Sequence, residues 1–405
     1  MTAELATADP KATSAQRKHG LMEDEIYWRD LQPWLEEHGY MLRPRYRPGW
    51  KPYEDRPGEP FTYREDSHWL LVPVIIDATR FSDGSLVIMK KVTVDSHPFE
   101  LEVGQFLSSD EITSDPRNHC VRIMDVLSDP SEPNVSIVVL PYLRAFNDPE
   151  FLTFREALAC LKQLIEGLRV MHENHVAHRD ISSMNVMMDA AAMYPDMWHP
   201  QVPNLKYDYL GEAKHYSRTE RPPKYYYIDF GLSRKYDPNS GPPQELPIFG
   251  GDKSVPEFQG DGYDRPANPF FTDIYYLGNL MRTQFVNQYR GFEFMQQLVT
   301  DMVQSDPEKR PTIAKVETQF DKSFRQLSIW KLRLRLVQRN EIALKRAIYA
   351  IAHIFRTAKY AVKRLPPFRP RRHDLRASVV SHDTFYIVVV LFRLSMSIGG
   401  YCRIL

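Results

Sequence analysis

The stretch His178–Asn185 reads H-R-D-I-S-S-M-N. Before it, between residues 154 and 172, apolar side chains recur every three or four positions, which predicts an amphipathic helix. Thr153 and Glu156 form a capping box at the start of this helix. After it, an apolar run from Tyr226 ends in Asp229-Phe230-Gly231. The chain therefore places charged and amide side chains directly after buried elements.

These two motifs, H-R-D-x-x-x-x-N and D-F-G in this order, resemble those of the eukaryotic-type protein kinase superfamily. One four-residue match arises by chance on the order of once in several hundred such chains, so a second motif makes coincidence remote. The aromatic stretch Lys224–Ile228 and the run Ile329–Arg335 are similar to those of fungal proteins that contain a protein kinase domain. The resemblance covers roughly residues 65–320.

The resemblance implies an α+β, bilobal protein-kinase-like fold with a small β-rich lobe and a larger helical lobe. It also implies ATP and Mg²⁺ as cofactors. Asp180 is then the catalytic residue that accepts or orients the proton of the substrate hydroxyl, and Asn185 and Asp229 hold the metal. Both metal ligands are oxygen donors, as the hard Mg²⁺ ion requires.

The sequence Val87-Ile88-Met89-Lys90 is similar to the V-A-I-K motif of the same family. The family assigns its lysine to the ATP phosphates, so we assign Lys90 to this role rather than Lys91. Its carboxylate partner is expected on the next helix, where Glu100 and Glu102 both qualify. We favour Glu102, because Phe106 follows it by four positions and would pack one turn further on.

The adenine site is expected where an apolar strand runs into Leu140-Pro141-Tyr142-Leu143. Backbone groups of Tyr142 and Leu143 would meet the base. The predicted cofactor-binding set is Lys90, Leu140, Tyr142, Leu143, Ile88 and Met187.

Three further motifs in the C-terminal half match the family in order. Val255-Pro256-Glu257 is similar to A-P-E, Asp273–Gly278 to D-x-x-x-L-G, and Asp306–Pro311 to D-P-x-x-R-P. The resemblance implies a buried ion pair between Glu257 and Arg310, and hydrogen bonds from Asp273 to the catalytic-loop backbone. These elements belong to a protein-substrate platform, which argues against a small-molecule phosphotransferase.

The chain also departs from the family. No glycine lies between Gly58 and Gly84, where a glycine-rich phosphate loop is expected, so every Cβ obstructs close approach of the backbone to phosphates. Ser182 replaces a lysine, which removes a charge-assisted contact of about 1.5–3 kcal/mol. The activation segment, residues 232–254, has no threonine, and residues 190–224 are an insertion. Two readings follow: a protein kinase, acting on Ser/Thr more than on Tyr, or a pseudokinase that serves as a nucleotide- or protein-binding scaffold.

The predicted domains are residues 1–60, an N-terminal extension with a Pro-rich linker; residues 61–320, the kinase-like domain; and residues 321–405, a basic tail. Expected elements before the 154–172 helix are a helix at 23–38, a hairpin with strands at 70–76 and 85–94, a helix at 99–107 and a strand at 136–143.

Charge is unevenly distributed along the chain. Residues 321–405 hold 18 Lys/Arg and 4 Asp/Glu, a net +14, so residues 1–320 carry −14 in a chain whose total is zero. Three scattered cysteines, without a C-x-x-C pair, fit a reducing compartment inside the cell, cytoplasmic or nuclear. His172, His175 and His178 recur every three residues, but the run crosses from a helix into a loop, so no metal site is expected there.

The sequence does not identify the protein substrate. No nucleic-acid partner is expected, since the sequence has no RNA-recognition or finger signature. No firm membrane association is expected either, because Arg393 and Arg403 interrupt the apolar stretch 385–405. The basic amphipathic segment 330–364 suits docking on the acidic body, contact with an anionic membrane surface, or a partner groove.

Overall fold

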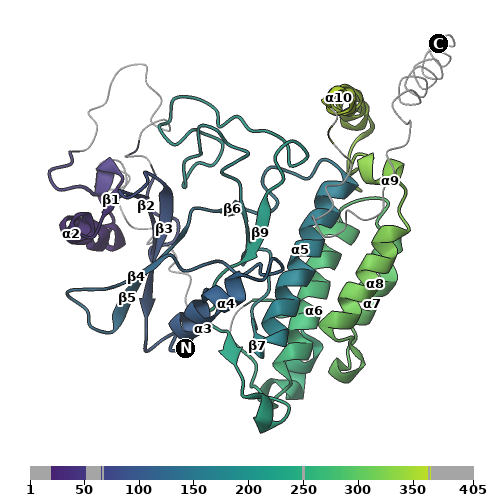
Figure 1. The fold of residues 1–405 in the computed structure, drawn as a ribbon, viewed down its shortest axis with the longest axis horizontal. Helices are drawn as coiled ribbons and strands as arrows, with labels where there is room; N and C mark the ends of the chain where they lie inside the picture. The colour runs from purple at the N-terminus through teal and green to yellow at the C-terminus, as the bar shows by residue number, and fades with distance from the viewer. Residues whose placement is uncertain (1–19, 52–64, 66–67, 249–250, 364, 366–405) are drawn as a thin grey trace.

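The computed structural model describes residues 20–51, 65, 68–248, 251–363 and 365. It is a mixed α and β structure in which a curled antiparallel sheet lies in the N-terminal region and most helices follow it along the chain (Figure 1). This agrees with the predicted α+β class. Much of the predicted Pro-rich linker, and the predicted tail beyond residue 365, lie outside the described residues.

The sheet has five antiparallel strands in the order β1-β2-β3-β5-β4. They are Tyr40–Leu42 (β1), Ile75–Arg80 (β2), Leu86–Thr93 (β3), Asp125–Ser128 (β4) and Val135–Pro141 (β5). The predicted pairing of two strands around Asp83 is confirmed, because β2 pairs with β3. The first strand was predicted at 70–76 but runs from Ile75 to Arg80, because residues 71–74 form bends and turns. Side chains alternate along β3, so Val87 and Met89 are buried in the core while Ile88 and Lys90 lie on the other face.

Helix α2 (Glu23–Glu37) packs against this sheet. Trp28, Leu31 and Leu35 lie on its buried face and share one apolar cluster with residues of β1, β2, β3 and β5. Ile26, by contrast, is 37% exposed. Strand β1 pairs with β2, so the boundary predicted at residue 61 falls inside the sheet. Strand β1 was not predicted, because three residues followed by the long connection 43–74 show too little periodicity to indicate a strand.

The helical part surrounds α5. Its helices are Glu100–Leu107 (α3), Asp110–Thr113 (α4), Phe154–Glu173 (α5), Pro269–Met281 (α6), Gln296–Met302 (α7), Ile313–Arg325 (α8), Ile329–Arg333 (α9) and Ala343–Val362 (α10). The predicted α5 is confirmed, and the Thr153 side chain caps it by accepting a hydrogen bond from the Glu156 backbone N–H. A large apolar core joins α5 to α6, α7 and α8. Helix α8 spans the boundary predicted at residue 320.

Two small sheets complete the described structure. The strands Arg144–Ala145 (β6), Val186–Asp189 (β8) and Lys224–Tyr227 (β9) form one, and Val176–Ala177 (β7) pairs with Arg234–Lys235 (β10) in the other. These short pairs flank the loops that carry the two motifs. They fix the ends of the predicted catalytic loop and the residues that follow Asp229.

The predicted insertion, residues 190–224, is an ordered segment between β8 and β9. Tyr194 and Trp198 are buried, and the Tyr142 hydroxyl donates to the carbonyl of Trp198 at 2.8 Å. The Tyr207 hydroxyl donates to Asp77 Oδ2 at 2.9 Å, which ties the insertion to β2. The insertion therefore connects the sheet to the helical part.

The same insertion anchors the C-terminal end of α10. The Tyr360 hydroxyl donates to Ser217 Oγ at 2.5 Å, and the ammonium groups of Lys359 and Lys363 lie 3.0 and 3.2 Å from Glu220 Oε1. Burial raises the pKa of Glu220, but hydrogen bonds from Lys359, Ser217 and Lys363 outweigh it and lower this pKa to about 2. The basic segment thus docks on the body at one end.

Among the helices of the described ranges, none combines the length and the apolar character needed to cross a membrane.

Candidate functional site

A cavity of about 200 Å³ lies beside the sheet, where residues of both predicted motifs reach it. Its lining is largely apolar and comes from β2, β3, β5, β8 and α3. The residues are Ile75, Ile88, Leu101, Val121, Ile123, Val138, Leu140, Pro141, Leu143, Met187, Ile228 and Phe230, with the charged side chains of Lys90, Glu100 and Asp229. An apolar wall with a few converging charges is the usual form of a small-molecule site.

Five of the six predicted cofactor-binding residues line this cavity: Lys90, Ile88, Leu140, Leu143 and Met187. Tyr142 does not. Its side chain is buried and turns to the insertion, where its hydroxyl is bonded to Trp198. The prediction for Tyr142 concerned its backbone, so its side chain has a separate, structural role.

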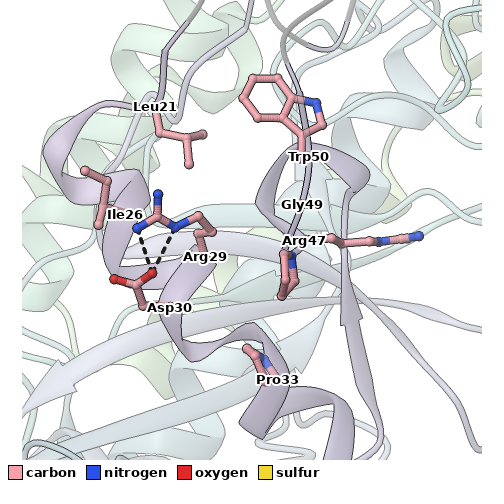
Figure 2. A pocket seen from close by; sticks show the side chains of 9 residues that line it. Leu21, Ile26, Arg29, Asp30, Pro33, Arg47, Gly49 and Trp50 are labelled. Carbon is pink, nitrogen blue, oxygen red and sulfur yellow. Dashed lines mark hydrogen bonds and ion pairs between the residues drawn. The ribbon is translucent and has the colours of Figure 1, made fainter.

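A larger hollow, of about 630 Å³, lies between α2 and residues 47–50 (Figure 2). Arg29 and Asp30, which form an ion pair of adjacent residues at 2.7 Å, lie on its wall with Trp50 opposite. None of the sequence motifs reaches it. The smaller cavity is the candidate site because the predicted residues converge there.

Lys90 carries the charge at the centre of the site. Its Nζ donates to Glu100 Oε1 at 2.5 Å and to Asp229 Oδ1 at 2.9 Å. Burial alone would lower the pKa of Lys90, but the carboxylates of Asp229 and Glu100 outweigh it and raise this pKa. The lysine is therefore a fixed cation between two carboxylates.

The choice of Glu102 as the partner of Lys90 is wrong. Glu100 takes this place at the first turn of α3, and the Glu102 side chain is exposed to solvent. Residues two positions apart on a helix are rotated by about 200° from each other, so the carboxylates of Glu100 and Glu102 point to opposite sides of α3. Phe106 does pack against the core, but this contact does not determine which carboxylate faces the sheet.

Asp180 and Asn185 lie together in the loop that begins with His178. The Asn185 amide donates to the Asp180 backbone carbonyl at 2.9 Å and to its Oδ2 at 2.8 Å. Burial, followed by the charge of Asp229, raises the pKa of Asp180 to about 7. The other carboxylate oxygen, Oδ1, is buried without a hydrogen-bond partner among the described residues.

Two backbone conformations mark these motifs as strained. Arg179 has φ of +68° and Asp229 has φ of +64°, a left-handed region that side chains other than glycine adopt at a cost. Burial raises the pKa of Asp229, but Lys90 outweighs it, so the pKa of this carboxyl is lowered. Gly231, two positions on, has no side chain to obstruct the site, since a Cβ there would lie 2.9 Å from His97 Nδ1 and 3.2 Å from Glu100 Oε2.

The donor set fits a hard cation. The Asn185 Nδ2 is used by Asp180, which leaves its amide oxygen, and Asp229 is held ionised by Lys90. Oxygen donors of this kind suit Mg²⁺. The run of three histidines does not form a metal site: His172 Nε2 lies 3.0 Å from Asp273 Oδ2 and His178 Nε2 lies 3.1 Å from the Ile228 carbonyl. No cluster of three His, Cys, Asp or Glu ligands occurs in the described part of the chain.

Asp273 supports the loop as predicted. This fully buried carboxylate accepts hydrogen bonds from the backbone N–H of His178 at 2.8 Å and of Arg179 at 2.7 Å. The predicted ion pair also forms: Arg310 donates to both carboxylate oxygens of Glu257, at 2.7 and 2.6 Å. These contacts hold the loop geometry rather than take part in chemistry.

A further ion pair, between Arg179 and Glu245, was not predicted from the sequence. Arg179 Nη2 lies 3.2 Å from Glu245 Oε2, and the Tyr236 hydroxyl donates to Glu245 Oε1 at 3.1 Å. Arg179 also donates to the carbonyls of Leu232 and Leu246. A carboxylate of the segment itself therefore holds residues 232–246 against the loop.

Gly251 lies directly over Asp180. A Cβ on Gly251, which has φ of +55°, would lie 1.9 Å from Asp180 Oδ1. The backbone of the segment therefore covers the carboxylate oxygen that has no partner. Residue 251 has to be glycine for this approach, because any side chain would overlap the carboxylate.

Comparison of the sequence with models of known families and with curated proteins found no match to either.

Proposed function

We propose that this chain is an ATP- and Mg²⁺-dependent protein kinase that transfers the γ-phosphate to a protein hydroxyl, on Ser or Thr more than on Tyr. The observation that carries the proposal is the arrangement around Lys90. A partly buried lysine bridges Glu100 and Asp229 at the wall of an apolar cavity, and Asp180 and Asn185 are hydrogen-bonded to each other in the other motif. Phosphoryl transfer depends on such positioning of charges.

The proposal includes a bilobal protein-kinase-like fold. Its support is the five-stranded antiparallel sheet followed by helices, with the cavity lined by strands, by α3 and by residues of the second motif. The Glu257–Arg310 pair and the Asp273 hydrogen bonds are further support, because the sequence resemblance led us to expect both.

We assign a binding or catalytic role to each group of residues at the cavity. The apolar wall, with Ile88, Leu140 and Met187, takes the adenine ring, and Lys90 contacts the phosphates. Asp229 and Asn185 would hold Mg²⁺, which neutralises phosphate charge when bound. Asp180 orients the acceptor hydroxyl and receives its proton. A pKa near neutrality suits this role, since a general base works best when its pKa lies close to the working pH.

A second candidate is a catalytically weak or inactive pseudokinase that binds nucleotide or protein. Two observations favour it: the connection between β1 and β2 has no glycine-rich loop, and Ser182 stands in place of the expected lysine. Fold alone does not decide between the two.

The test is transfer of label from γ-labelled ATP with Mg²⁺, to the protein itself and to a generic protein substrate. The wild type is compared with Asp229→Asn and with Asp110→Asn, an exposed aspartate at the start of α4 that serves as a matched control. We expect transfer by the wild type and the control and none by Asp229→Asn. Thermal stabilisation by Mg-ATP without transfer would favour a nucleotide-binding scaffold. If neither transfer nor stabilisation occurs, the kinase and the nucleotide-binding scaffold are both contradicted, and a protein-binding scaffold remains.

A further inference from the structure

Helix α10 carries a row of exposed apolar side chains that nothing in the described structure covers. Leu344, Ile348, Ile351, Phe355 and Val362 are all exposed, Phe355 by 72% and Val362 by 84%. They follow one another at intervals of four, three, four and seven residues, so they form a single stripe on one face of the helix. From Leu344 to Val362 this stripe is about 27 Å long.

The stripe faces away from the body. Helix α10 is held by Tyr360, its one buried residue, whose hydroxyl is bonded to Ser217 of the insertion. At about 100° per residue, Tyr360 and the partly buried His353 lie roughly 160–180° from the centre of the stripe. Figure 1 shows α10 at the margin of the helical part, beside α9.

All of the charged side chains of α10 are basic. The helix contains Lys345, Arg346, Arg356 and Lys359 and no Asp or Glu. Lys345, Arg356 and Lys359 lie within about 60–120° of the stripe, so their aliphatic stems flank it. A strongly apolar stripe bordered by cations is the pattern of helices that lie in the plane of an anionic membrane surface.

We propose that α10 docks on an anionic lipid surface through the stripe Leu344, Ile348, Ile351, Phe355 and Val362. Charge argues against the other occupants. Residues 366–405 of the same chain hold six arginines and two aspartates, a net +4, and a second copy of α10 brings four cations toward four cations. Anionic headgroups instead pair with the flanking Lys345 and Arg356, since Lys359 is already paired with Glu220, while the stripe enters the acyl boundary. The proposal is independent of phosphate transfer.

The experiment is co-sedimentation of the full chain with vesicles, either phosphatidylcholine mixed with phosphatidylserine or phosphatidylcholine alone. Phe355→Glu tests the stripe, and Leu71→Glu is the matched control, since Leu71 is 71% exposed in the β1–β2 connection. Lys345→Glu tests the charge. Because all three side chains are exposed, we expect each variant to keep the wild-type melting temperature.

We expect the wild type to sediment with the anionic vesicles and not with the neutral ones. Phe355→Glu should weaken this binding at least about tenfold, and Leu71→Glu by less than about twofold. Each cation near the surface strengthens binding about fivefold, so reversing the charge of Lys345 should weaken it by at least that factor. Raised salt should weaken it as well.

Four results would overturn the proposal. The first is no sedimentation with either vesicle, and the second is equal sedimentation with both. The third is unchanged binding by Phe355→Glu, which would assign lipid binding to residues 366–405. The fourth is a wild-type dimer in light scattering that Phe355→Glu converts to a monomer, which would assign the stripe to a second copy.

Discussion

The pairing of Lys90 gives the sharpest test of the site, because the sequence and the structure disagree on its partner. Changing Glu100 to Gln removes the charge that lies 2.5 Å from the lysine and keeps the size of the side chain. The pair is largely shielded, with 16% of the Lys90 side chain and 9% of the Glu100 side chain exposed. Solvent screening is therefore weak.

The expected loss follows from that geometry. A hydrogen bond between charged groups contributes about 1.5–3 kcal/mol, and its loss leaves Lys90 free to shift toward Asp229. If Lys90 positions the phosphates, kcat/KM falls about 10- to 150-fold. Glu102→Gln is the matched control. Glu102 is exposed and has no ion pair within the described residues, so its change should alter the rate by no more than about twofold.

The assay is the initial rate of transfer from γ-labelled ATP over a range of ATP concentrations, with the melting temperature of each variant measured beside it. A lower rate in Glu100→Gln at an unchanged melting temperature isolates positioning from stability. Equal losses in the Glu100 and Glu102 variants, or an unchanged rate in Glu100→Gln, would refute the assignment.

Three further predictions concern carboxylates elsewhere. Glu257→Gln leaves the buried guanidinium of Arg310 without its charged partner, so the free energy of unfolding in urea should fall by about 3–5 kcal/mol, and a fall below about 1 kcal/mol would contradict this. Glu245→Ala frees Arg179, so we expect slower phosphate transfer and faster proteolysis within residues 232–254; no change in either would show that the backbone carbonyls suffice. Glu220 has a folded-state pKa of about 2 and an ordinary value of 4.5, so its contribution is complete above pH 4.5 and is lost as the pH falls toward 2. The stability difference between wild type and Glu220→Gln should shrink across that window in urea unfolding, and a constant difference would contradict the assignment.

The features that were predicted correctly from the sequence are those whose positions depend on the pattern of nearby residues. Lys90 was identified by its place in a motif at a strand end, and the structure puts it on the cavity side of β3 with Ile88. The α5 helix was found by the spacing of its apolar side chains. In both cases the information lies within a few residues, so neighbours in the chain are enough to determine the result.

The features that the sequence missed depend on contacts between distant segments. Glu100 and Glu102 both satisfy the spacing, and only the rotation of α3 against the sheet decides which one meets Lys90. Arg179 and Glu245 lie in different loops, so no motif joins them. Strand β1 has three residues, and its pairing with β2 comes after the long connection 43–74. Tertiary packing determines each of these, and a single sequence does not encode it in a local pattern.

The contact between Gly251 and Asp180 bears on which proposed function the chain performs. A buried carboxylate oxygen without a partner costs about 1–3 kcal/mol, and a scaffold gains nothing from it. Under the proposed kinase function, this oxygen would receive the acceptor hydroxyl, which would give the cost a function. The segment is held on one side by Glu245 and on the other by the Tyr275 hydroxyl, which donates to the Ser254 carbonyl at 2.8 Å. These contacts hold residues on either side of Gly251, and the cost of the unpaired Asp180 oxygen favours the proposed kinase over the scaffold.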